Sequence, residues 1–310
     1  MRQMTERLDQ QSASAARRRG GGRPLGTAIR YLIFLGPAAL LYVPFVLKPL
    51  IETFGLSLFA WNGVSAERTF VGLANYARAL GDPIFWISLR NNLYWVVTSI
   101  VLPMATGLVI AVLLSAVRRG QRIYAGIFFT PVVLNLIIVG LVWGIIYNPL
   151  IGPLNRLLRA VGLGSLAIGW LGDRYAATPA IMVAGAWTFF GFCAVIFLQG
   201  LRTLDREQIE AATIDGAGPF RRFRKIIVPA LSDQVTLLIV MSIIGSFKVF
   251  DIVYVMTKGG PDHASEVIAT YMYWQSFMNG SLGYGAALAV MLTAVVAGAS
   301  LAMMALRERD

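Results

Sequence analysis

A lysine and an aspartate lie three residues apart within one otherwise apolar run. They are Lys248 and Asp251, and the run extends from Val235 to Met256. Ionisable side chains are costly in lipid, and those found there usually face a cavity or a partner. Residues three apart share one face of a continuous helix. The two residues therefore either form an internal ion pair or provide polar contacts for solute hydroxyls, with the rings of Phe247 and Phe250 beside them.

Three further side chains in apolar runs are candidates for the same cavity. Asn135 follows Pro131, while Thr188 and Phe192 lie four residues apart in a later run. Each could instead pack or hydrogen-bond between helices, as polar residues in membrane helices often do. We favour Asn135, because a side-chain amide needs hydrogen-bond partners in hydrocarbon.

Other chemistries find little support in the sequence. One cysteine, Cys193, and one histidine, His263, cannot supply a disulfide or a multi-ligand metal site from this chain. The four lysines follow Leu, Arg, Phe and Thr, so no phosphate-binding Gly-Lys pair is present. The apolar runs also lack the clustered carboxylates, His pairs or Cys-His arrangements of an intramembrane enzyme. We therefore predict no catalytic residue, no metal site and no cofactor bound by this chain.

The composition predicts an integral membrane protein. Of 310 residues, 57% are hydrophobic and 14% are charged, whereas soluble domains carry about 25% charged residues. About 20 mostly apolar residues are needed to cross a bilayer. Six stretches qualify, which predicts an all-α fold with six transmembrane helices: Tyr31 to Leu50, Leu93 to Val117, Ile123 to Tyr147, Ala180 to Leu198, Val235 to Met256 and Ala286 to Leu306.

The basic residues predict the orientation, because Lys and Arg are retained on the cytoplasmic side. Seven lie in the tail 1–30, three in 118–122, six in 201–225 and two at the C-terminal end. The three segments on the opposite side carry seven in total. Both termini are therefore expected in the cytoplasm, with a basic tail at 1–30, a transmembrane domain at 31–306 and a short end at 307–310.

One cytoplasmic segment, DREQIEAATIDGAGPFRRFRKIIVP, interrupts the apolar pattern from Asp205 to Pro229. Asp205 and Gln208 have the spacing of a helix cap, and Gly216 suits the left-handed residue that ends a helix. Pro219 suits the first turn of a second, basic helix. A short helix carrying Ala211 and Ala212 has little apolar area of its own, which favours docking into another protein's groove. The alternative is a connecting loop that merely obeys the positive-inside rule.

The same segment resembles the EAA loop of the membrane subunits of binding-protein-dependent ABC importers. Glu210, Ala211 and Ala212 match EAA, Gly216 matches the glycine four residues on, and Ile226 and Pro229 match the distal end. FDIVYVMTKGGP, from residue 250, and FVGLANY, from residue 70, resemble the carbohydrate-uptake branch related to the maltose transporter. The resemblance spans roughly residues 30 to 306.

This resemblance implies a type I importer permease fold and several partners. These are a second permease subunit of similar fold, an ATP-binding subunit dimer that binds ATP and Mg²⁺, and an extracytoplasmic solute-binding protein. The coupling segment, residues 201–229, would insert into a cleft of the ATPase. The residues implied in that contact are Glu210, Ala211, Ala212, Asp215, Gly216, Ala217 and Pro229.

The resemblance also bears on the solute. The helix corresponding to Val235–Met256 supplies substrate contacts in the maltose transporter's larger membrane subunit, which favours substrate roles for Phe247, Lys248 and Asp251. Lys248 departs from the neutral amides of that family, so a solute with a negative charge, such as a sugar phosphate, comes into consideration beside neutral sugars and polyols.

Two functions are consistent with these features. The first is the permease subunit of an ATP-driven importer of a sugar or sugar-like solute in a bacterial or archaeal plasma membrane, working by alternating access. The second is a self-sufficient secondary transporter that uses Lys248 and Asp251 for ion coupling. The coupling segment favours the first.

Overall fold

The computed structural model describes residues 24–117, 119–204, 212 and 214–307. The chain divides into two compact units, residues 1–55 and 56–310, which are considered separately. Glu210 and Ala211, together with the predicted cap at Asp205, lie outside the described residues.

The first unit is a run of helix. α2, Pro24–Tyr42, continues through a π turn, Val43–Leu47, into α3, Lys48–Leu56. Within the π turn the Lys48 N–H bonds the Val43 carbonyl, and the next residue, Pro49, has no N–H with which to continue the normal pattern. The stretch Ile33–Leu56 is long and apolar enough to cross a membrane, as the sequence predicts for residues 31–50.

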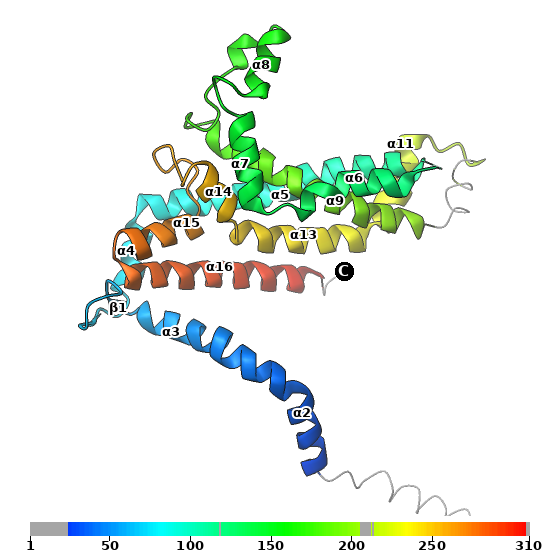
Figure 1. Cartoon of the computed structure of the whole chain (residues 1–310). Coiled ribbons are helices and arrows are strands. Elements are labelled where there is room, and N and C mark those ends of the chain that lie inside the picture. Colours follow the sequence, from blue (N-terminus) through cyan, green and yellow to red (C-terminus); the bar gives the residue numbers. More distant parts are fainter. Residues whose placement is uncertain (1–23, 118, 205–211, 213, 308–310) are drawn as a thin grey trace, which may run out of the picture. The chain divides into compact units, whose positions relative to one another are not determined.

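Long helices dominate the second unit. They are α5, Pro83–Ser115, α9, Ala177–Arg202, α13, Ser232–Phe247, and α16, Leu282–Arg307. α5 packs along α9 and α13 (Figure 1). A buried cluster around Phe197 and Leu238 lies where these three helices meet. A second cluster, around Trp95 and Ile181, lies between α5, α9 and residues 249–267.

The predicted third span, Ile123 to Tyr147, is a bent pair of helices rather than one rod. α6, Gln121–Val133, and α7, Leu136–Ile146, meet at 97°. Pro131 near the end of α6 cannot donate a helical hydrogen bond. Leu134 and Asn135 then adopt extended backbone, and the Asn135 side chain accepts a 2.8 Å hydrogen bond from the Ile137 N–H. The asparagine thus starts α7 as its N-cap.

A second bent pair leads from the predicted coupling segment into α13. Its first arm joins α11, Pro219–Arg222, a π turn, Phe223–Ile227, and α12, Val228–Ala230. Pro219 occupies the first helical position, as predicted. The arm meets α13 at 66°.

The predicted fifth span, Val235 to Met256, is wrong as a continuous helix. α13 ends at Phe247, and α14, Asp251–Met256, starts after an irregular stretch in which Phe250 has φ −142° and ψ −60°. Lys248 and Asp251 therefore do not share one helix face. Neither proline nor glycine lies at this break, so its cause is tertiary.

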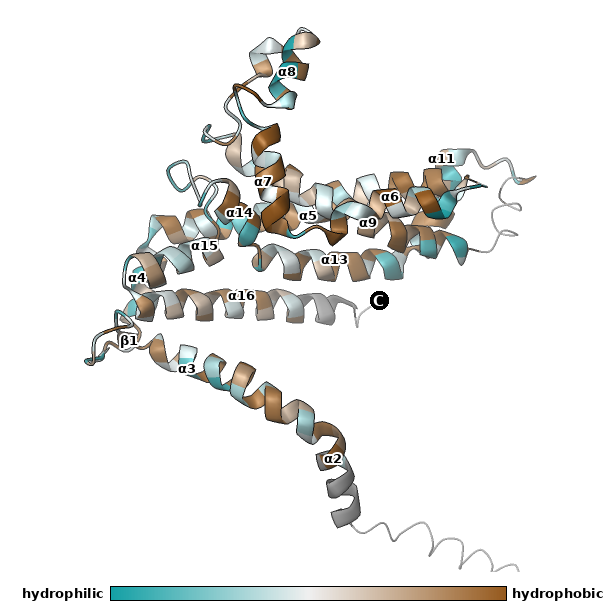
Figure 2. Cartoon of the chain, viewed as in Figure 1, coloured by the Kyte–Doolittle hydropathy of each residue, from teal (hydrophilic) through white to brown (hydrophobic). Residues whose placement is uncertain are grey.

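The helices agree with the predicted multi-span membrane protein. Within the described ranges, four single helices are long and apolar enough to span a bilayer, and up to six spans result if each bent pair counts as one. Figure 2 shows mostly apolar residues along α7, whereas α8 and the stretch beside α11 contain both polar and apolar residues.

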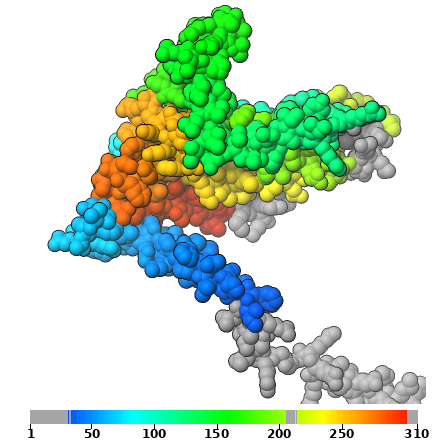
Figure 3. Space-filling view, in the orientation of Figure 1, coloured from blue at the N-terminus to red at the C-terminus, as the bar shows by residue number. Residues whose placement is uncertain are grey.

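Short elements make up the remainder of the second unit. Phe59–Ala60 and Thr69–Phe70 form a two-stranded antiparallel ladder, β1 and β2, which the all-α prediction missed. The short helices are α4, Ala74–Gly81, α8, Pro153–Ala160, the 3₁₀ turn Gly164–Leu166, α15, Ile268–Tyr273, and the π turn Trp274–Met278. Figure 3 shows the segment around α8 standing out from the packed helices of this unit.

Asp82 fixes the start of α5 against the C-terminal helices. Its carboxylate accepts the Ile84 N–H at 2.9 Å and the Tyr284 hydroxyl at 2.8 Å, and it also accepts the Tyr271 hydroxyl. Burial favours the neutral carboxyl, but these donors outweigh burial and hold the pKa of Asp82 below its ordinary value. The ionised aspartate thus ties α5, α15 and α16 together at one point.

Glycines allow α9 to approach its neighbours closely. A Cβ at Gly107 of α5 would lie 2.6 Å from the Cβ of Cys193, and a Cβ at Gly191 would lie 1.9 Å from the Phe128 carbonyl oxygen of α6. Small residues of this kind let membrane helices pack by van der Waals contact, which replaces the hydrophobic driving force that lipid removes.

Gly191→Ala should therefore destabilise the protein by about 1–3 kcal/mol, because the added methyl overlaps a backbone carbonyl that cannot move aside. Gly126→Ala is the matched control, since a Cβ at this α6 glycine meets nothing within 4 Å; it should be neutral or stabilising by up to about 1 kcal/mol. Thermal unfolding of the detergent-solubilised protein measures both. Equal shifts in the two variants would contradict the close α6–α9 contact.

Candidate functional site

A cavity of about 340 Å³ lies where α5, α9 and α13 meet the break that follows α13. Trp95 and Ser99 of α5, Phe189 of α9 and Ser242 of α13 contribute to its wall. The break supplies the charged part of the wall. The site thus combines aromatic faces, hydroxyls and ionisable groups, which is the composition expected of a pocket for a small polar solute.

The structure brings three of the predicted substrate residues to this cavity. Lys248, Asp251 and Thr188 line it, as does Phe250, whose ring stacks on Tyr254 with centroids 5.2 Å apart. Lys248 and Asp251, both described, form no ion pair with each other. They face one cavity because the chain turns between them, and not because of the helical spacing from which they were predicted.

The other three predicted substrate residues lie elsewhere. Asn135 is exposed, caps α7 through its side-chain oxygen and does not line the cavity. Phe192 stacks on Phe189 at 5.5 Å and packs into the cluster around Phe197. Phe247 is 3% exposed and does not line the cavity. Phe192 and Phe247 therefore pack between helices, which is the alternative to a role in solute binding.

Sequence reasoning missed the hydroxyl groups of the wall. The Oγ atoms of Ser99 and Ser246 lie 2.7 Å apart, Ser246 Oγ donates to the Ser242 carbonyl at 2.7 Å, and Ser242 Oγ donates to the Ser99 carbonyl at 3.2 Å. Ser242 and Ser246 are four residues apart in an apolar run, a spacing that places both on one helix face. That spacing was the available signal.

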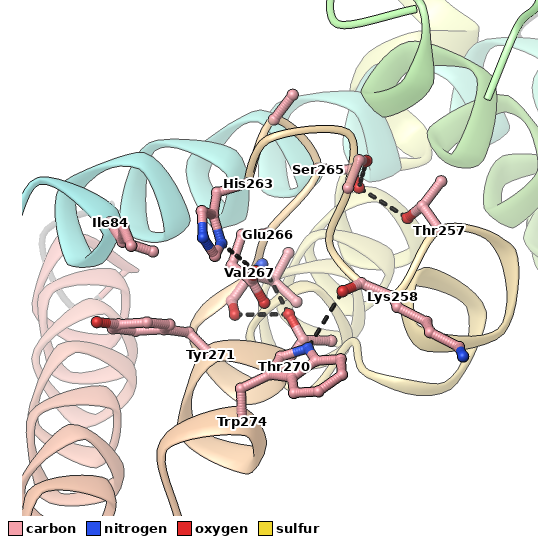
Figure 4. A network of polar contacts seen from close by, with 12 residues as sticks. Ile84, Thr257, Lys258, His263, Ser265, Glu266, Val267, Thr270, Tyr271 and Trp274 are labelled. Atoms are coloured by element: carbon pink, nitrogen blue, oxygen red, sulfur yellow. Dashed lines mark hydrogen bonds and ion pairs between the residues drawn. The ribbon is translucent and has the colours of Figure 1, made fainter. Parts of the chain in front are cut away.

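The loop that follows α14, residues 257–267 and called the outer loop below, is braced by polar contacts, as Figure 4 shows. Thr257 Oγ1 and Ser265 Oγ lie 2.7 Å apart, and the Trp274 indole N–H donates to the Lys258 carbonyl at 3.1 Å. His263 Nδ1 lies 2.8 Å from Glu266 Oε2. The loop therefore has a fixed shape that does not depend on regular secondary structure.

Glu266 is the buried centre of this loop. Its side chain is 1% exposed, and burial raises the pKa of the carboxyl above its ordinary value, although the neighbouring His263 opposes the shift. Gly259 packs directly on the carboxyl group, because a Cβ there would lie 2.4 Å from Oε2. Gly259 also has φ +90°, a conformation that favours glycine.

The described part of the coupling segment has the predicted helix end. Gly216 has φ +74°, and the Ala217 N–H bonds the Ala212 carbonyl at 2.9 Å, the pattern of a Schellman motif. Ile214 and Phe220 are 86% and 76% exposed. Two large apolar side chains beside a glycine turn form a surface that a partner could cover.

The start of the coupling segment is hydrogen-bonded to the preceding helices. Arg202, the last residue of α9, donates to the Gln121 amide oxygen at the start of α6. The Gln121 amide in turn donates to the Leu114 carbonyl near the end of α5 at 2.7 Å. A displacement of the coupling segment thus has a direct path to α5, α6 and α9.

Taken together, the fold and this cavity define a helical, multi-span membrane protein with a small, mostly apolar cavity that carries a few polar and charged groups. Among the described residues no three His, Cys, Asp or Glu side chains come together as metal ligands.

Comparison with known proteins gives the family. Residues 104–309 match the binding-protein-dependent transport system inner membrane component family. The probable ABC transporter permease protein YurN of Bacillus subtilis is 37% identical over 274 residues, which cover 88% of this chain and 94% of that protein. The diacetylchitobiose uptake system permease protein NgcF of Streptomyces coelicolor is 35% identical over 292 residues, with coverages of 89% and 83%.

A solved structure shows the same fold. It is the crystal structure of a bacterial alginate ABC transporter in complex with alginate pentasaccharide-bound periplasmic protein, with a TM-score of 0.78 at 18% identity, covering 93% of this chain and 98% of that chain. The chain belongs to the family of binding-protein-dependent transport system inner membrane components. It is a non-catalytic permease subunit of an ABC transporter, as the resemblance in its sequence implied.

Gly259→Ala should destabilise the outer loop, because the methyl meets the buried Glu266 carboxyl in addition to straining the backbone. Gly162→Ala is the matched control, since Gly162 has φ +80° but a Cβ there meets nothing within 4 Å. We expect proteolysis of the native protein after residue 258 to increase more in Gly259→Ala than in Gly162→Ala. Equal behaviour would mean that Glu266 does not constrain the loop.

Proposed function

We propose that this chain is a permease subunit of an ATP-driven importer that translocates a sugar or sugar-like solute, including sugar phosphates and polyols. The family description and the relative named for diacetylchitobiose uptake support this proposal. The observation that carries it is the polar and aromatic cavity at the α13–α14 break, where Lys248, Asp251 and Thr188 converge. Aromatic faces and hydroxyls suit the alternating apolar and polar surfaces of a sugar.

The proposed transporter contains several other chains. A second permease subunit of similar fold would complete the pathway, and an extracytoplasmic binding protein would deliver the solute. A dimer of ATP-binding subunits would bind ATP and Mg²⁺ in the cytoplasm, since this chain lacks a phosphate-binding loop. The assembly would lie in a bacterial or archaeal plasma membrane, with both termini of this chain in the cytoplasm.

Coupling to ATP hydrolysis is assigned to the segment that follows α9. Glu210, Ala211 and Ala212 would enter a cleft of the ATPase, followed by Asp215, Gly216 and Ala217. Ile214 and Phe220 add exposed apolar surface to the same contact. Closure of the ATPase would then displace Arg202 and, through Gln121, the ends of α5 and α6. Alternating access would follow because α5 and α9 carry part of the cavity wall.

Gly216→Val should abolish uptake and ATPase association while leaving membrane insertion intact, because a β-branched residue is strongly disfavoured at φ +74°. Gly218→Val is the matched control, since Gly218 has φ −62° and no close neighbour. Glu210→Lys should have the same effect as Gly216→Val by reversing the charge of the contact.

Co-purification with the ATPase and uptake by whole cells measure these outcomes. Normal transport by Gly216→Val and Glu210→Lys would overturn the coupling assignment. Solute movement by the purified chain alone in liposomes, driven by an ion gradient, would support the secondary-transporter alternative instead.

Lys248→Gln should raise the KM for anionic solutes about tenfold, the equivalent of roughly 1.4 kcal/mol, and leave the KM for neutral sugars unchanged. A suitable panel is sn-glycerol 3-phosphate, glucuronate, maltose and diacetylchitobiose. Lys258→Gln is the control, because Lys258 is exposed and lies outside the cavity. If the wild type transports only the neutral solutes of this panel, and Lys248→Gln transports them with the same KM, Lys248 does not recognise a charge on the solute.

A further inference from the structure

Two adjacent asparagines of α5 hold both ends of the segment that closes the cavity. Asn91 and Asn92 are 1% and 0% exposed. The segment, Phe247–Val267, contains the break, α14 and the braced outer loop, and is called the closing segment below. Sequence reasoning passed over both asparagines, because they stand at the outer end of a span and match no motif.

Asn92 supplies a hydrogen bond that a continuous α13 would make to itself. In an unbroken helix the Ser246 carbonyl would accept the Phe250 N–H, four residues on. Here the Asn92 side-chain amide donates to that carbonyl at 2.9 Å. The side chain therefore satisfies a helix-end carbonyl that would otherwise be left without a partner at membrane depth.

The same side chain also starts the next helix. Its carbonyl oxygen accepts the Ile268 N–H at 3.0 Å. Ile268 is the first residue of α15, where the backbone N–H groups have no partner within the helix. One buried amide thus caps the C-terminal end of α13 and the N-terminal end of α15.

Asn91 holds the outer loop between these two points. Its amide donates to the Ala264 and Glu266 carbonyls, each at 2.8 Å. From α9, the Thr178 hydroxyl also donates to the Ala264 carbonyl at 2.9 Å. The closing segment is thereby fastened to α5 and α9, two of the helices that line the cavity.

We propose that Asn91 and Asn92 are positioning residues of the solute cavity, and that Asn92 keeps α13 broken so that Lys248 and Asp251 face it together. The proposal rests on the proposed function in taking this cavity as the solute site. Without the Asn92 amide, the Ser246 carbonyl is satisfied only if α13 extends to recruit the Phe250 N–H or if water enters the break. Either change moves the charged part of the wall relative to α5 and α9.

The first test measures the break itself. Val249 lies in the break and is 8% exposed, so the thiol of Val249→Cys, in a Cys193→Ser background, reports local opening. In native membranes, adding Asn92→Ala should raise the rate of N-ethylmaleimide labelling about five- to thirtyfold, the effect of losing one or two kcal/mol of local stability. Asn91→Ala should raise the rate less, because it releases only the outer loop.

Asn155→Ala is the matched control. Asn155 is also 1% exposed and hydrogen-bonded through both ends of its amide, to the Ile168 carbonyl and the Trp170 indole, but it contacts no part of the closing segment. It should leave labelling at Val249→Cys unchanged. A separate Asn92→Ala protein that keeps Val249 and the native Cys193 reports global unfolding, because Cys193 is 0% exposed and should stay unlabelled.

The second test measures function. The solute is the member of the panel above that the wild type carries. Asn92→Ala should raise the KM for its uptake about tenfold or more. The maximal rate, corrected for the amount of folded protein, should change less. The positioning role would be overturned if Asn92→Ala left the labelling rate at Val249→Cys unchanged. It would also be overturned if Asn92→Ala raised the labelling of Val249→Cys and of the native Cys193 alike, because that result indicates global unfolding. Raised labelling with an unchanged KM would retain that role and show that the cavity is not the solute site, which would overturn the proposed function.

Discussion

The structure depends on one constraint, that every backbone polar group within a bilayer must have a hydrogen-bond partner. A helix meets this constraint automatically, and a break in a helix does not. The break after α13 exists because the amide of Asn92 takes the place of a backbone N–H at the Ser246 carbonyl. The position of the charged residues in the cavity wall and the change of direction into α14 both follow from this hydrogen bond.

Close packing of the long helices supports the same arrangement. The glycines at 107 and 191 bring α9 against α5 and α6. The serines at 99, 242 and 246 pair with each other across α5 and α13. Their hydroxyl groups are therefore satisfied between helices, which allows a polar wall within an apolar bundle without exposing unpaired groups to lipid.

The segment around Gly216 follows a different physical principle. Around Gly216 the chain ends one helix and begins another, leaving Ile214 and Phe220 exposed. A surface of this kind gains little from its own chain and has most to gain from a partner. Arg202 at the end of α9 and Gln121 of α6 connect this segment to α5, which links the proposed ATPase contact to a helix of the cavity wall. The outer loop around Glu266, by contrast, is braced within itself and against α5.

The sequence by itself determined the membrane class, most of the spans and the family. Those features depend on composition, length and contiguous motifs, which local physics governs. It also predicted the glycine turn at Gly216 and the helix start at Pro219, because both depend on backbone preferences of single residues. Which residues face the cavity was decided by tertiary structure alone. Asn135 was assigned to a ligand and caps α7, while Lys248 and Asp251 reach one cavity because their helix is broken. That break is made by a side chain 154 residues earlier in the chain, and no local pattern around Phe250 could reveal it.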